Sequence, residues 1–227
     1  MTVVASRTEH GPLAEHLDAA LTAVAGLHPH LPTVMSWAEQ LRRCLDGGRR
    51  LLVAGNGGSA ALAQHLTSEL VGRFDAERPA YSALCLSAET SSLTAIGNDY
   101  GFDHAFARQV QAHGRPGDIL LTLTTSGRSV NLLQAAAEAR RLGLIVWAMT
   151  GPLPNPLSGQ ADEVLDVGAA TSAAAVQEAQ QVAVHLLCRA FDAALRRHPA
   201  PERDGSTSTA LMTDWADQGG DGKQVGR

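Results

Sequence analysis

Two helical stretches carry side chains of the kinds that move protons or hold metal ions. His65 and Glu69 are four residues apart, which sets an imidazole and a carboxylate on one face of a helix. Gln177, Gln181 and His185 repeat at four-residue intervals through an otherwise apolar stretch. A single histidine in such a pattern is more often a surface or hydrogen-bonded residue than a ligand. The spacing therefore leaves both a structural and a chemical role open.

Two turns rich in glycine and hydroxyls follow short apolar runs. The glycine turn, residues 55–59 (Gly-Asn-Gly-Gly-Ser), lacks the G-x-G-x-x-G spacing of a dinucleotide site, which disfavours a nicotinamide cofactor. The hydroxyl turn, residues 124–129, precedes a predicted helix whose first N–H groups can receive an anion. One hydroxyl is enough to cap a helix, so the four in this turn favour phosphate binding over capping alone. They belong to Thr124, Thr125, Ser126 and Ser129.

The supply of lysine limits the possible chemistry. Of the 18 basic residues in this chain of 227, only Lys223 is a lysine, and it lies in the polar C-terminal stretch. Schiff-base enzymes, pyridoxal-phosphate enzymes and P-loop nucleotidases all require a lysine held in a structured site. Catalysis here must therefore use carboxylate, imidazole, hydroxyl, amide or metal.

Charge, cysteines and hydropathy exclude further classes. A net charge of −5 argues against nucleic acid as a partner. Cys44, Cys85 and Cys188 form no C-x-x-C pair, so we expect buried thiols rather than disulfides or a thiolate zinc site. The apolar runs are shorter than the ~20 residues of a membrane helix, so we expect no membrane association. The first thirty residues also lack a secretory pattern, and a cytoplasmic protein is expected.

Hydrophobic periodicity divides the chain into three parts. Residues 1–48 read as two amphipathic helices, expected to pack on the domain and in oligomer contacts, the first with Leu13, Leu17, Leu21 and Val24 on one face. From 49 to 197, short apolar runs alternate with helical patterns, which predicts an α/β domain with a doubly wound, parallel five-stranded sheet flanked by helices. Residues 198–227 are polar and are expected to form a disordered tail. The predicted strands cover residues 51–54, 83–87, 118–124, 144–150 and 163–167, and the last helix covers 173–197.

The motifs in combination resemble the phosphoheptose isomerase family, whose members have the sugar-isomerase (SIS) fold. The resemblance covers residues 30–197 and rests on the glycine turn, on the hydroxyl turn and on the pattern around the two helical stretches. The matching segments are residues 55–59, His65, residues 69–73, residues 96–102, residues 125–129, Gln177 with Glu178, and His185.

The resemblance implies roles for individual residues. Glu69 and His185 match the family's acid/base pair, with Glu69 expected as the base. Members can hold a zinc ion between side chains that match His65, Glu69, Gln177 and His185. The family is also expected to form homotetramers whose pockets take residues from neighbouring subunits. The expected sugar-phosphate pocket comprises Asn56, Gly57, Gly58, Ser59, Glu69, Asn98, Asp99, Thr124, Thr125, Ser126, Ser129 and Gln177.

The expected reaction is the aldose-ketose isomerisation of sedoheptulose 7-phosphate to D-glycero-D-manno-heptose 7-phosphate through an enediol, toward nucleotide-activated heptoses. These residues are consistent with both a metal-assisted and a purely acid-base route. One alternative is a non-catalytic SIS module that binds a sugar phosphate or a protein. The other is an isomerase of a different sugar phosphate.

Two positions depart from the family pattern. Arg128 stands in the hydroxyl turn where a small polar residue is expected, and Leu62 stands where the family often has Asp. The guanidinium of Arg128 could contact phosphate or could be a solvated surface group. Both departures bear on the substrate rather than on the reaction.

Overall fold

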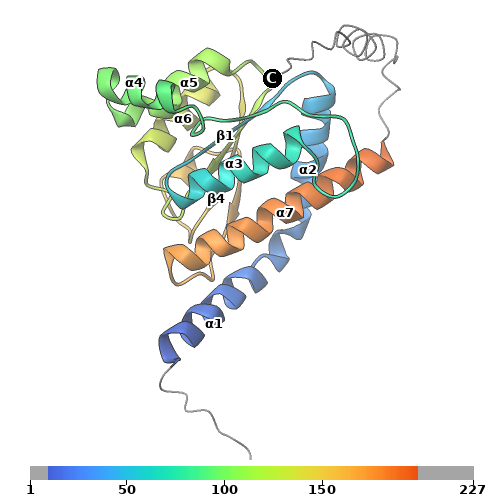
Figure 1. The fold of residues 1–227 in the computed structure, drawn as a ribbon, viewed down its shortest axis with the longest axis vertical. Coiled ribbons are helices and arrows are strands. Elements are labelled where there is room, and N and C mark those ends of the chain that lie inside the picture. Colours follow the sequence, from blue (N-terminus) through green and yellow to red (C-terminus); the bar gives the residue numbers. More distant parts are fainter. Residues whose placement is uncertain (1–9, 199–227) are drawn as a thin grey trace, which may run out of the picture.

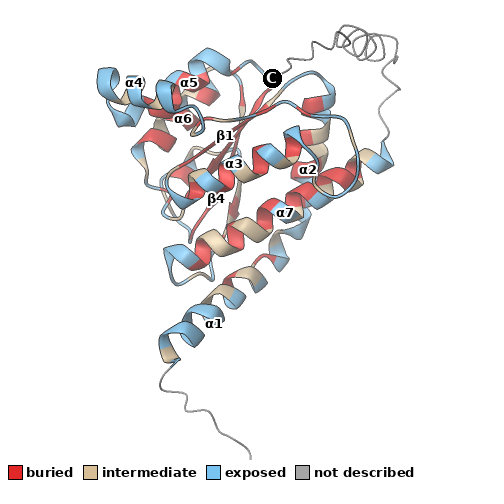
Figure 2. Cartoon of the chain, in the orientation of Figure 1, coloured by how far each residue is buried: buried red, intermediate tan, exposed pale blue. Residues whose placement is uncertain are grey.

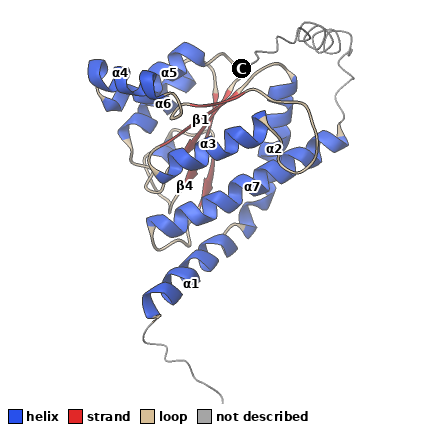
Figure 3. Ribbon diagram, viewed as in Figure 1, coloured by secondary structure: helices blue, strands red, loops and turns tan. Residues whose placement is uncertain are grey.

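The protein is described by a computed structural model for residues 10–198, and these form a three-layered α/β domain. Five parallel strands in the order β2-β1-β3-β4-β5 make the middle layer, with helices on both faces (Figures 1 and 3). The strands are β1 (Leu51–Gly55), β2 (Ala83–Cys85), β3 (Ile119–Leu123), β4 (Ile145–Thr150) and β5 (Glu163–Asp166). The predicted fold class and all five strands are confirmed. The predicted tail, residues 198–227, lies outside the described residues apart from His198.

The helices that carry His65, Glu69 and His185 lie on one face of the sheet. This face carries α1 (Gly11–Ala25), α2 (Leu31–Asp46), α3 (Gly58–Val71) and α7 (Ala173–Arg197). The other face carries α4 (Thr90–Tyr100), α5 (Ala105–His113) and α6 (Val130–Arg141). Short 3-10 turns complete the element list at His28–His30, Phe102–His104 and Leu157–Gly159.

Strand alternation builds two separate cores. Leu51 and Val53 of β1 contribute to the core under α2, α3 and α7, whereas Leu52 and Ala54 contribute to the core under α5 and α6. Successive side chains of a strand point to opposite faces, so a fully apolar strand serves both cores at once. All five residues of β1 and all five of β3 are buried (Figure 2). The apolar runs in the sequence are therefore the signature of a sheet covered on both faces.

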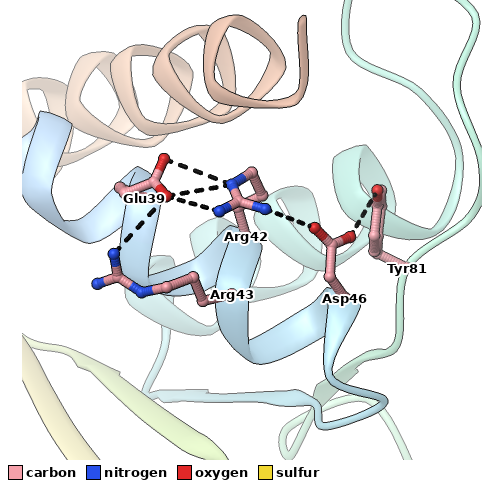
Figure 4. Close-up of polar contacts among 5 residues, drawn as sticks. All are labelled: Glu39, Arg42, Arg43, Asp46 and Tyr81. Carbon is pink, nitrogen blue, oxygen red and sulfur yellow. Dashed lines mark hydrogen bonds and ion pairs between the residues drawn. The ribbon is translucent and has the colours of Figure 1, made fainter. Parts of the chain in front are cut away.

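The second helix fastens the N-terminal region to the sheet. Trp37 of α2 stacks on Trp147 of β4 with ring centroids 4.5 Å apart and planes within 4°. Its indole Nε1 donates a hydrogen bond of 2.9 Å to Glu163 of β5. The outer side of α2 carries an ion-pair network in which Arg42 binds Glu39 and Asp46, and the hydroxyl of Tyr81 donates to Asp46 (Figure 4). The second helix of the predicted pair is thus part of the folded body.

The first helix is attached more loosely. It packs along α7, yet Ala23 is its one buried residue (Figure 2). Leu13, Leu17 and Leu21, the apolar face seen in the sequence, are 73%, 59% and 60% exposed. Residues 10–198 by themselves do not cover this face.

The cysteines behave largely as expected. Cys44 and Cys188 are buried, and burial raises the pKa of their thiols to about 11 and about 12. Cys85 is only half-buried, and burial raises its pKa as well. All three are free thiols. Raised pKa values keep them protonated at neutral pH, so none is an activated nucleophile.

Candidate active site

The glycine turn connects β1 to α3 at the carboxyl edge of the sheet. Gly57 has φ +56°, a conformation that side chains disfavour, and Gly58 begins the helix. A Cβ on Gly58 would lie 2.6 Å from the amide of Gln177, so glycine is required for α7 to come this close. Asn56 and Asn131 exchange two amide hydrogen bonds of 2.9 Å, which tie the turn to α6.

The hydroxyl turn is shaped by its own first residue. Thr124 Oγ1 accepts hydrogen bonds from the backbone N–H of Ser126 at 3.4 Å and of Gly127 at 3.2 Å. Ser126 is exposed, and its hydroxyl accepts from the N–H of Arg128 at 3.2 Å. Ser129 is the N-cap residue of α6, yet its hydroxyl makes no capping bond. A role as a helix cap therefore does not account for the hydroxyls of this turn.

A buried amide that the sequence analysis did not single out supports the hydroxyl turn. Gln180 of α7 is fully buried, and its Nε2 donates to the carbonyls of Thr124 at 3.0 Å and Met149 at 2.9 Å. These bonds join α7 to the ends of β3 and β4. The sequence held one indication of this role, because Gln180 is a third amide within one turn of Gln177 and Gln181. A polar residue on the apolar side of a helix requires a hydrogen-bond partner.

Carboxylate and imidazole groups meet between α3 and α7. Nε2 of His65 and Nε2 of His185 lie 2.9 Å apart, although the two residues are 120 positions apart in the chain. Glu69 Oε1 lies 3.5 Å from His65 Nε2, one turn further along α3. We call His65, Glu69 and His185 the acid/base cluster. The structure brings these three predicted residues together, with the side chains of His65 and Glu69 37% and 19% exposed.

The amide beside the cluster is Gln181. Its Nε2 lies 3.0 Å from His185 Nε2, whereas the side chain of Gln177 packs two turns away against Gly58. Phe74 adds an aromatic wall, with its ring centroid 5.7 Å from that of His185. Sequence spacing identified the polar stripe of α7, but the contacts assign each amide a different neighbour.

Two other predicted pocket residues lie elsewhere in the single chain. Asn98 and Asp99 are exposed near the end of α4, where the amide of Asn98 donates to the carboxylate of Asp99 at 2.8 Å. Helix α4 packs on the face of the sheet opposite α3 and α7 (Figure 1). Within residues 10–198 the acid/base cluster and these two side chains are therefore on different sides of the domain.

Comparison with known proteins now decides the family. Residues 31–151 match the family model of the SIS domain. A phosphoheptose isomerase of Streptomyces coelicolor is 53% identical over 204 residues, which cover 89% of this chain and 88% of the relative. The chain belongs to the phosphoheptose isomerase family.

Solved structures agree with this assignment. A phosphoheptose isomerase from Francisella tularensis has a TM-score of 0.77 at 37% identity, covering 82% of this chain and 99% of that one. Another, from Neisseria gonorrhoeae, has a TM-score of 0.75 at 35% identity, covering 82% of this chain and 100% of that one. The five-stranded SIS fold expected from the motifs is therefore confirmed.

The two departures from the family pattern have different surroundings. Arg128 is exposed at the rim of the hydroxyl turn, whereas Leu62 is buried in the core beneath α3. An aspartate at position 62 would face apolar neighbours in this chain, so leucine suits the packing. Only Arg128 is situated where it could meet a ligand.

The acid/base cluster has the donor types that zinc takes. Two imidazoles and a carboxylate are common zinc ligands, and the two Nε2 atoms lie 2.9 Å apart between α3 and α7. Residues 10–198 contain no ready-formed group of three His, Cys, Asp or Glu side chains around a metal position. The histidines instead contact each other. The donor types fit zinc, but in this arrangement the three side chains do not surround a metal position, and Gln177, the fourth expected ligand, packs against Gly58.

No helix within the described part of the chain is long and apolar enough to cross a bilayer.

Proposed function

We propose that this member of the phosphoheptose isomerase family converts sedoheptulose 7-phosphate into D-glycero-D-manno-heptose 7-phosphate, for the synthesis of nucleotide-activated heptoses. The observation that carries the proposal is the acid/base cluster, in which His65 Nε2 lies 2.9 Å from His185 Nε2 and 3.5 Å from Glu69 Oε1. An aldose-ketose isomerase needs one group to remove a proton from C1 and another to stabilise the enediolate oxygen. A module that only binds a sugar phosphate has no need of these residues.

In this proposal Glu69 is the base and His185 the acid. The Glu69 carboxylate takes a proton from C1 of the ketose, and the enediol that forms receives a proton at C2. His185 donates a hydrogen bond to the oxygen on which charge develops, and His65 lies within 2.9 Å to hold its ring. The second imidazole thus restricts the orientation of the first.

The phosphate is proposed to bind at the hydroxyl turn. Thr125, Ser126 and Ser129 offer hydroxyls there, and α6 begins at the same turn with first N–H groups that have no partner within the helix. Thr124 shapes the turn through its two accepted hydrogen bonds. Asn56, Gly57, Gly58, Ser59 and Gln177 are proposed to hold the sugar hydroxyls.

Zinc is proposed as a resident ion, one per subunit, held by His65, Glu69 and His185. The fourth expected ligand, Gln177, packs against Gly58 two turns away along α7 in this chain. When bound, it would polarise the carbonyl and hydroxyl oxygens of the sugar as a Lewis acid. Its support is the donor types of the acid/base cluster and the neutral-imidazole chemistry that zinc requires. Whether turnover depends on the ion is decided by the chelator arm of the experiment below.

A homotetramer with shared pockets is also proposed. Glu69 lies eleven residues beyond Gly58, which is about 16 Å along the axis of α3 at 1.5 Å per residue. One chain thus separates its glycine turn from its acid/base cluster, and Asn98 and Asp99 lie across the sheet. A neighbouring subunit could supply the missing half, and the exposed leucines of α1 offer a surface for it. We further propose a cytoplasmic location, because charged sugar phosphates do not cross membranes unaided.

The decisive experiment is an NMR assay of the purified chain with sedoheptulose 7-phosphate in deuterated water. Product carrying deuterium at C2 supports isomerisation through an exchanging enediol. Loss of activity after a strong chelator, restored by zinc, supports a catalytic ion, whereas full activity supports the acid-base route alone. No conversion in any condition overturns the proposal in favour of another sugar phosphate or a binding module.

A further inference from the structure

A buried arginine binds the end of the helix that carries Glu69. Arg78 lies in the segment between α3 and β2, and its side chain is only 7% exposed. Its Nη2 donates to the backbone carbonyl of Glu69, and its Nη1 donates to that of Leu70 at 3.0 Å. The last carbonyls of a helix have no partner within the helix, and one guanidinium here satisfies two of them.

The same guanidinium reaches the other helix of the site. Arg78 Nε donates to Asp192 Oδ1 at 3.1 Å, and the Asp192 side chain is 6% exposed. Asp192 follows His185 by seven residues, or about two turns, so both project from the same face of α7. Rings of Tyr81 and Phe191 flank the guanidinium at 5.6 and 5.7 Å. We call Arg78 and Asp192 the arginine clamp.

The clamp completes a series of contacts between α3 and α7. Gly58 meets Gln177 near the start of both helices, and His65 meets His185 at the middle. Arg78 then joins the end of α3 to Asp192. The helices therefore run side by side in the same direction, and a slip or rotation of either one would break the clamp.

We propose that Arg78 and Asp192 are positioning residues, which hold the Glu69 carboxylate against the His185 imidazole at the spacing that proton transfer requires. The clamp binds the backbone of Glu69 itself, so its loss shifts the base directly. A misplacement of about 1 Å at a reacting group can cost about a hundredfold in rate. The inference rests on the proposed isomerase activity.

A purely structural role predicts something different. Breaking a buried ion pair lowers stability wherever it occurs, because the remaining charge is left without its partner. A positioning role predicts in addition a loss of kcat in the folded variant with little change in KM, because the proposed phosphate contacts are at the other end of the helices. The test must therefore measure kcat and KM separately, and must measure stability independently of both.

The test compares Asp192→Asn, Arg78→Lys and Arg78→Met with the wild type. Steady-state kinetics with sedoheptulose 7-phosphate are measured at a temperature well below the Tm of each variant. We expect Asp192→Asn to lower kcat about tenfold or more with KM within about twofold. Arg78→Lys should recover part of the kcat lost in Arg78→Met, because an ammonium keeps the charge but not the fork that joins both helices. We expect kcat to decrease in the order wild type, Arg78→Lys, Arg78→Met.

The matched control is Asp118→Asn. Asp118 is also buried, lies 3.7 Å from Arg50 and accepts backbone N–H bonds, but it is at the amino edge of the sheet. We expect it to lower Tm while kcat stays near that of the wild type. The positioning role of the clamp is overturned if this control loses kcat to the same extent. It is also overturned if folded Asp192→Asn and Arg78→Lys keep the kcat of the wild type.

Folding failures are also decisive. Circular dichroism reports whether each variant folds. If Asp192→Asn does not fold, the kcat of Arg78→Lys tests the proposal. If Asp192→Asn and Arg78→Lys both fail to fold while Asp118→Asn folds, the clamp is needed only for folding, and the positioning role is overturned. An inactive wild type overturns the proposed function and this inference together, whereas an active wild type with unaffected clamp variants overturns only the inference.

Discussion

At the scale of single residues, side chains of one type perform different tasks because their neighbours differ. Gln177, Gln180 and Gln181 lie within five positions of α7. Gln177 packs on the glycine turn, Gln180 holds the ends of two strands, and Gln181 contacts His185. Only the partly exposed members, Gln177 and Gln181, are available to a substrate, so the buried amide of Gln180 serves to position the site.

Glu69→Gln tests the assignment of the base. The amide keeps the shape of the side chain but cannot accept the proton, so we expect kcat to fall by about 10²-fold or more with KM little changed. Steady-state kinetics with sedoheptulose 7-phosphate measures both. Glu138→Gln, which alters a carboxylate paired with Arg141 on α6, should leave kcat unchanged. Near-normal kcat in Glu69→Gln would remove this residue from the proton transfer.

Ser126→Ala tests the hydroxyl turn. Its hydroxyl is exposed, and a lost hydrogen bond to a charged group costs about 1.5–3 kcal/mol, so we expect KM to rise about tenfold or more with a smaller change in kcat. Ser36→Ala, on the remote helix α2, should change neither parameter. A loss confined to kcat would contradict a phosphate contact at Ser126.

At the scale of elements, α2 shows how a helix is stabilised without approaching the site. Trp37 anchors its inner side, and Arg42 links Glu39 and Asp46 on its outer side (Figure 4). The pKa of the Glu39 carboxyl is lower than its ordinary value of 4.5, mainly because Arg42 donates a hydrogen bond to it. The folded state therefore favours the charged form of Glu39.

A stability measurement against pH tests this network. A carboxyl whose pKa is lowered on folding stabilises the protein above its unfolded pKa, and this contribution is lost as pH falls through the folded value. We expect Glu39→Gln to be less stable than the wild type by about 0.5–1 kcal/mol at pH 7. The difference should shrink as the pH falls below about 4.5, in chemical unfolding monitored by circular dichroism. A gap that stays constant down to pH 2 would assign the effect to packing instead.

At the scale of the whole molecule, the described part of the chain leaves the apolar face of α1 exposed. Leu13, Leu17 and Leu21 share one side of a helix that projects from the body (Figures 1 and 2). Exposed apolar stripes of this kind are typical of surfaces that contact another protein. A second copy of the chain is the occupant that the proposed tetramer requires.

The variant Leu13→Ser/Leu17→Ser/Leu21→Ser tests that requirement. We expect sedimentation to show a smaller assembly than the wild type, and kcat/KM to fall by about tenfold or more because the proposed pocket is shared. The variant Glu15→Gln/Asp18→Asn changes exposed polar positions of the same helix and should keep the assembly and the activity. An unchanged assembly in the triple variant would assign the subunit contacts to another surface.

The sequence by itself determined the elements and the two turns of this protein. Each strand was evident as a short apolar run, and α7 was predicted with the bounds Ala173–Arg197. The glycine and hydroxyl turns were evident because glycine and helix-start hydroxyls act through local backbone geometry. Such features depend on neighbours a few residues away, and periodicity reports them directly.

Only the tertiary structure decided which side chains meet. His65 contacts His185 across 120 positions, and Arg78 contacts Asp192 across 114. It also decided that Gln181 rather than Gln177 contacts His185, and that the leucines of α1 remain exposed. A repeat along one helix gives the direction of a side chain but not the element that lies opposite, because that depends on how distant segments pack.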